Sequence, residues 1–72
     1  MAEHVKQITE ALRILRMKQV IDRTGMSRST IYEKIAEGIF PRQVCLSARS
    51  VGFVESEIND WISHRIAQRK AA

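Results

Sequence analysis

Cysteine, glycine and long apolar runs are all scarce in this sequence, and each shortage excludes a class of protein. The single cysteine, Cys45, cannot form a disulfide within the chain, which fits a reducing cytoplasm. No segment is apolar enough over a sufficient length to cross a bilayer, and the first residues do not resemble a signal peptide. We therefore expect a protein of a bacterial or phage cytoplasm that has no membrane contact.

The side chains that catalysis requires are also few and scattered. His4 and His64 lie near opposite ends of the chain and Cys45 lies far from both, so the spacing of zinc ligands is absent. No glycine-rich phosphate loop occurs, and no Ser/His/Asp grouping has a pocket to serve. Cys45 is interpreted as a small strand residue, with a reactive thiol as the alternative. We predict that the chain is not an enzyme and that it binds no metal, cofactor or small-molecule ligand.

The charge is positive and unevenly distributed. The 72 residues carry 12 lysines and arginines against 8 acids, enough for one small domain with a formal net charge of +4. Residues 13–50 hold eight bases and three acids (+5), whereas residues 51–64 hold three acids and no base (−3). Such a concentration is typical of a phosphate-binding surface. Ordinary solubility charge is the alternative explanation.

The clearest local signal is a pair of short helices joined by a tight turn. The first is expected over residues 17–24 and is ended by Gly25, because glycine adopts the left-handed conformation most readily. Ser27 is placed to cap the second helix, with Met26 and Ile31 at the two hydrophobic-staple positions around it.

The second helix is expected over residues 28–37, to bury Ile31 and Ile35, and to stop at Gly38. Its opposite face carries hydroxyl and charged groups. The pattern predicts a helix-turn-helix whose second helix is presented to another molecule.

The flanking segments predict a small sheet element and one more helix. Residues 14–15 are expected to dock on the core as a short extended piece, and Pro41 ends the helical part. Residues 43–47 and 51–53 alternate with period two around a short polar connection, which predicts a β-hairpin. The last helix is expected from about 55 to 68. Its apolar stripe contains Ile58, Trp61, Ile62 and Ile66, and Trp61 is expected to contribute most to the core.

Several segments together resemble the AlpA family of small phage and prophage regulators, which is related to excisionases and to the DNA-binding domain of MerR-type proteins. They are RILRMKQV (13–20), TGMSRSTIY (24–32), FP (40–41) and SVGFVESEINDWI (50–62). Phe53 is a departure, because the family more often has tryptophan there. The resemblance implies a mostly α fold with a small β-hairpin, a winged helix-turn-helix of the MerR and excisionase kind, and sequence-specific binding to double-stranded DNA.

The expected domain organisation follows from this resemblance. We expect an N-terminal extension over residues 1–12, a winged-helix domain over 13–69 and a basic tail over 70–72. A transcriptional regulator is the first hypothesis, and an excisionase that helps an integrase to remove a prophage is the second. A protein-interaction module on the same scaffold is a third, from a different class.

The expected DNA-binding residues are polar side chains on the second helix, the hairpin and the start of the first helix. Arg28 is suited to guanine or phosphate, Ser29 and Thr30 to base edges, and Glu33 to cytosine N4. Arg49 is expected in a minor groove or on a flanking phosphate. For each of them a solvated surface side chain is the alternative. The full predicted set is Lys18, Ser27, Arg28, Ser29, Thr30, Tyr32, Glu33, Lys34, Arg42, Ser47, Arg49 and Ser50.

One recognition helix reads only a few base pairs, too few for tight and selective binding alone. We therefore expect a homodimer or a head-to-tail assembly on repeated sites of nucleoid DNA. An integrase or RNA polymerase is the expected protein partner.

Overall fold

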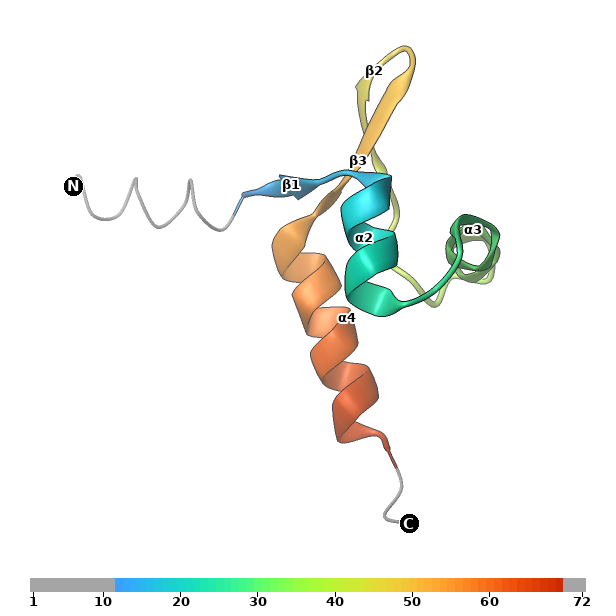
Figure 1. Ribbon diagram of the computed structural model, residues 1–72, viewed down its shortest axis with the longest axis vertical. Coiled ribbons are helices and arrows are strands. Elements are labelled where there is room, and N and C mark those ends of the chain that lie inside the picture. Colours follow the sequence, from blue (N-terminus) through green and yellow to red (C-terminus); the bar gives the residue numbers. More distant parts are fainter. Residues whose placement is uncertain (1–11, 70–72) are drawn as a thin grey trace, which may run out of the picture.

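The computed structural model describes residues 12–69, which form three helices and a three-stranded antiparallel sheet (Figure 1). In chain order the elements are β1 (Ile14–Leu15), α2 (Met17–Thr24), α3 (Arg28–Ala36), β2 (Val44–Ser47), β3 (Ser50–Val54) and α4 (Glu55–Ala67). This confirms the predicted class, mostly α with a small β element. The predicted extension, apart from Leu12, and the predicted tail over 70–72 lie outside the described residues. None of the described helices has the length and hydropathy needed to cross a membrane.

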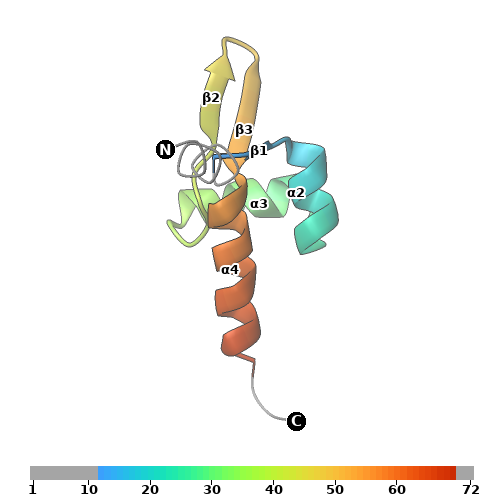
Figure 2. The ribbon, with the colours of Figure 1, turned by 90° about the vertical axis from the view of Figure 1, so that its left-hand side faces the viewer.

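The sheet is built around β3, which pairs with β2 on one side and with β1 on the other. The predicted hairpin is confirmed: Val44 faces Gly52 and Ser47 faces Ser50, with a bulge between the two pairs. The second pairing was not predicted, since the segment at 14–15 was expected only to dock on the core. Leu15 pairs with Phe53 in that ladder. Figure 2 shows the hairpin and α4 extending in opposite directions from the body of the protein.

The ends of α2 and α3 confirm the predicted caps. Gly25 has φ 73° and its N–H donates to the carbonyl oxygen of Ile21 at 2.8 Å, which ends α2. The hydroxyl of Ser27 accepts from the backbone N–H of Thr30 at 3.2 Å, which begins α3. Helix α3 ends at Ala36, one residue earlier than predicted, and Gly38 follows with φ 76°. A left-handed glycine therefore follows both helices.

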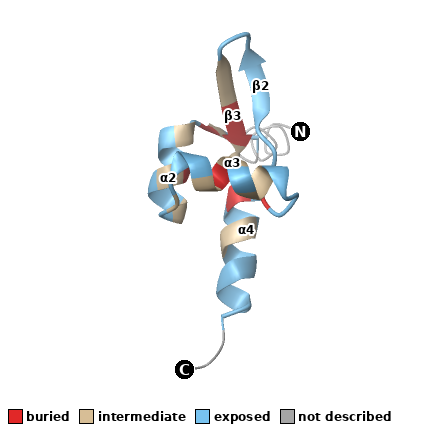
Figure 3. Ribbon diagram, turned by 90° about the vertical axis from the view of Figure 1, so that its right-hand side faces the viewer, coloured by how far each residue is buried: buried red, intermediate tan, exposed pale blue. Residues whose placement is uncertain are grey.

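The core lies where the three helices meet the base of the sheet (Figure 3). The largest fully buried side chain is Phe53. The ring of Phe40 packs edge-on against Phe53 at 6.2 Å and against Trp61 at 4.9 Å between centroids. The buried apolar residues are Leu15, Val20, Ile31, Phe40, Phe53 and Ile58.

Two expectations about the last helix were wrong in detail. Trp61 was expected to be the largest contributor to the core, but it is only partly buried, and its indole N–H donates to the carbonyl oxygen of Ile39 at 2.8 Å. Ile66 was placed on the buried stripe, but it is 53% exposed. The second half of α4 projects beyond the other elements, so no neighbour covers this position (Figure 1). On α3, Ile35 is only partly buried.

Candidate nucleic-acid interface

The exposed side of α3 forms a shallow hollow at the start of the helix. Its lining residues are Ser27, Arg28, Ser29, Tyr32 and Glu33. The last four lie on one helix face, because residues one turn apart stack above each other, while Ile31 turns inward and is fully buried. All five residues belong to the predicted DNA-binding set. Tyr32 is half-buried, and its hydroxyl has no hydrogen-bond partner among residues 12–69.

The hydroxyl groups at this helix start are partly committed to capping. Besides accepting from the Thr30 N–H, the Ser27 hydroxyl donates to the Thr30 hydroxyl at 2.9 Å and lies 3.3 Å from the Ser29 hydroxyl. Thr30 is half-buried, and Ser29 and Arg28 are exposed. The cap therefore holds Thr30 in place and leaves the two exposed side chains free to contact a ligand.

A second hollow lies between the starts of α2 and α3 and the hairpin. Cations from three separate elements line it: Arg16, Lys18, Arg28 and Arg49. Three of these were predicted, and the structure brings them to one hollow although Lys18 and Arg49 lie 31 positions apart in the sequence. Arg16 was missed. Nothing in the sequence around Arg16 indicates that its side chain lines the same hollow as residues of the hairpin.

The other predicted residues are spread over different parts of the surface. Arg42 lines a hollow between α3 and the hairpin, together with Gln43 and Cys45. Ser47 and Ser50 face each other next to the hairpin turn. Lys34 lines a different hollow, together with residues of α4. Seven of the twelve predicted residues thus line the two hollows that share Arg28, and Lys34 lines neither.

The charges are arranged so that this side stays positive. Among residues 12–69 the one ion pair joins Arg23 to Glu55 at 2.9 Å, and Arg23 also donates to the Asn59 side chain at 3.0 Å. These contacts tie α2 to the first turns of α4 and neutralise one acid there. The cations of the second hollow are not within ion-pair distance of any acid in the same range.

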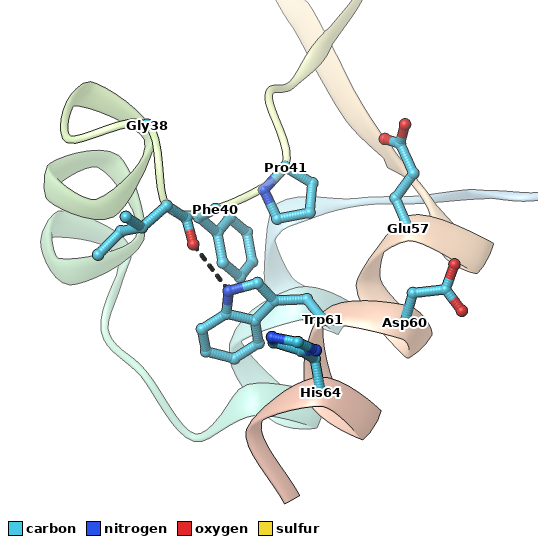
Figure 4. A pocket seen from close by; sticks show the side chains of 8 residues that line it. Gly38, Phe40, Pro41, Glu57, Asp60, Trp61 and His64 are labelled. Atoms are coloured by element: carbon cyan, nitrogen blue, oxygen red, sulfur yellow. Dashed lines mark hydrogen bonds between the residues drawn. The ribbon is translucent and has the colours of Figure 1, made fainter. Parts of the chain in front are cut away.

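The acids that remain on α4 border a separate groove (Figure 4). Glu57, Asp60 and His64 lie along α4 there, and Phe40 and Trp61 form the apolar floor. Within the described residues no three His, Cys, Asp or Glu side chains are placed to hold a metal ion. The groove contains none of the predicted DNA-binding residues.

The three helices and the small sheet fit a winged helix-turn-helix, and comparison with known proteins identifies the family. Residues 13–66 match the family described as "Prophage CP4-57 regulatory protein (AlpA)". The chain belongs to this family, which confirms the resemblance seen in the sequence. Since the family consists of regulatory proteins, it also confirms that the chain is not an enzyme.

Two relatives illustrate the similarity. The chain is 48% identical over 58 residues to an uncharacterized protein, ORF88, of Enterobacteria phage P4, and the match covers 81% of this chain and 66% of that protein. It is 43% identical over 61 residues to the DNA-binding transcriptional activator AlpA of Escherichia coli strain K12. That match covers 76% of this chain and 87% of that protein.

Proposed function

We propose that this chain is a DNA-binding transcriptional regulator of the AlpA type. One observation carries the proposal: the exposed start of α3 presents Arg28, Ser29 and Glu33 from a rigidly capped helix, next to a hollow lined by cations. The relative that is named as a DNA-binding transcriptional activator supports the same function. Its name also supports activation of transcription, and a cytoplasmic location on the nucleoid follows from the function.

In this proposal residues 13–69 form a winged helix-turn-helix, with α3 in the major groove and the β2–β3 hairpin as the wing. The tight turn after α2 and the position of the hairpin beside α3 support this assignment. The first turns of a recognition helix reach deepest into the groove. Arg28 would pair with guanine or with phosphate and Glu33 would accept from cytosine N4.

The rest of the predicted set would hold the backbone on either side of the groove. Arg42, Ser47 and Ser50 lie on or beside the hairpin, where phosphate contacts fit their position. Because one recognition helix contacts few base pairs, we also propose that two or more copies bind repeated sites. An integrase or RNA polymerase remains the predicted protein partner.

The test is a binding experiment on DNA selected by the protein itself. Sites enriched from a random duplex pool would be measured with wild type and with Arg28→Ala. The variant should lose about 1–3 kcal/mol of specific binding and should discriminate less at one base position. Its thermal unfolding should not change, because the Arg28 side chain is exposed and makes no ion pair among residues 12–69.

Arg69→Ala is the matched control, since it removes the same charge from an exposed position beyond the end of α4. It should bind the selected sites like wild type. The proposal is refuted if no sequence is enriched, or if Arg28→Ala binds the enriched sites as tightly as the control does.

A further inference from the structure

The hollow between α2, α3 and the hairpin combines more positive charge than any single element supplies. It encloses about 320 Å³ and is lined by Arg16, Lys18, Arg28 and Arg49, with Met17 and Val51 between them. Arg16 precedes α2, Arg28 is the first residue of α3, and Arg49 lies in the turn between β2 and β3. Figure 3 shows these three elements on the side that faces the viewer.

This convergence is unfavourable in the free protein. Like charges around one concavity repel each other, and apolar walls such as Met17 and Val51 increase the local potential by excluding water. No acid lines the hollow, and between residues 12 and 69 none of its four cations is in an ion pair. An anion bound there would relieve the repulsion.

The backbone around Arg16 is rigid. Its N–H donates to the side chain of Gln19 at 2.8 Å, and its carbonyl oxygen accepts from the N–H groups of Gln19 and Val20 at 2.9 and 3.1 Å. All these contacts use the main chain of Arg16. The exposed side chain makes no capping hydrogen bond to α2 and lines the hollow.

We propose that this hollow holds one strand of duplex DNA through its phosphates, with Arg16 as an additional contact and Arg49 on phosphate and not on base edges. The inference rests on the proposed function and deepens it. Arg28 lines both this hollow and the one on the exposed face of α3. In this arrangement, the DNA strand at the edge of the groove read by α3 passes Arg28 and then enters the basic hollow. Binding of its phosphates there fixes the register of α3 on the duplex.

The test measures how binding to a short duplex of random sequence depends on KCl concentration. Each phosphate contact contributes about 0.9 to the slope of log K against log salt. Arg16→Gln and Arg49→Gln should each make the slope shallower by about 0.9, and the double variant by about 1.8. Arg69→Gln, the control at the far end of the molecule, should keep the wild-type slope.

Thermal unfolding distinguishes the loss of a contact with DNA from the loss of a contact that stabilises the fold. Both variants should unfold at the wild-type temperature or above it, because each removes a repelled charge and no hydrogen bond. Reduced binding accompanied by a lower unfolding temperature would overturn the proposal, because the loss would then follow from damage to the fold.

Two further binding results would also overturn it. One is a wild-type slope in the Arg16→Gln variant. The other is an Arg49→Gln variant that keeps the slope but loses a preference for A·T-rich flanks, which would assign Arg49 to the minor groove. If the wild-type protein does not bind the random duplex even at low salt, the proposed function itself fails.

Discussion

Replacing Gly52 with alanine tests the closest backbone approach in the sheet. Gly52 is buried in the middle of β3, between β1 and β2. A Cβ atom added there would overlap the Cγ2 of Ile14, and it would lie 3.1 Å from the Leu46 Cδ1 and 3.3 Å from the carbonyl oxygen of Leu15. The Ile14 methyl is attached directly to its Cβ, so it can move away only if Ile14 leaves its χ1 rotamer, which is stiff in a β-branched residue, or if β1 shifts.

The expected magnitude follows from two opposing terms. Overpacking a filled site costs about 1–3 kcal/mol, whereas alanine is more stable than glycine inside a strand by about 0.5–1 kcal/mol. We therefore expect Gly52→Ala to lower the free energy of unfolding by about 1–2 kcal/mol. For a domain of this size that corresponds to a melting temperature lower by roughly 4–16 °C.

The assay is urea and thermal unfolding, followed by circular dichroism and by the fluorescence of Trp61. Ile14→Ala supplies the matched background because it removes the overlapping methyl. In that background Gly52→Ala should be neutral or stabilising by up to about 1 kcal/mol, and the double-mutant cycle should show the difference as coupling. If Gly52→Ala is equally destabilising in the wild-type and Ile14→Ala backgrounds, the overlap with Ile14 is refuted. If it is destabilising in neither background, the close approach of the backbone at Gly52 is itself refuted.

Two further predictions concern single hydrogen bonds. Ser27→Ala should lower the free energy of unfolding by about 1 kcal/mol, because the first turn of α3 loses its cap. Ser27→Asp should keep the cap and the stability but weaken DNA binding through its negative charge. Equal melting temperatures for Ser27→Ala and wild type would contradict the predicted cap. Trp61→Phe should lose at least about 0.5–1.5 kcal/mol, since the bond to the Ile39 carbonyl is removed and a smaller aromatic ring takes the place of the indole. Circular dichroism measures this loss, and an unchanged melting temperature would show that the bond contributes nothing.

The features that the sequence predicted correctly are those that depend on near neighbours. Gly25 ends α2 because a residue without Cβ adopts the left-handed conformation easily, and Ser27 begins α3 because its hydroxyl reaches an N–H three residues later. The hairpin is equally local, since alternation and a short polar connection define it. Family membership was also predictable, because the family's motifs are short segments in a set order.

Other features depend on atoms that are distant along the chain, and the sequence alone did not reveal them. Ile66 has helical spacing with buried residues, yet it is exposed because nothing packs against the end of α4. The two-residue strand β1 is too short to show a period in the sequence, so only its pairing with β3 reveals it. That pairing also explains the glycine at position 52, because a Cβ there would overlap Ile14 of β1. The position of Arg16 beside Arg49 is likewise a consequence of tertiary structure. Helix ends are determined by contacts within one turn, whereas burial and the convergence of charges require the whole chain to be folded.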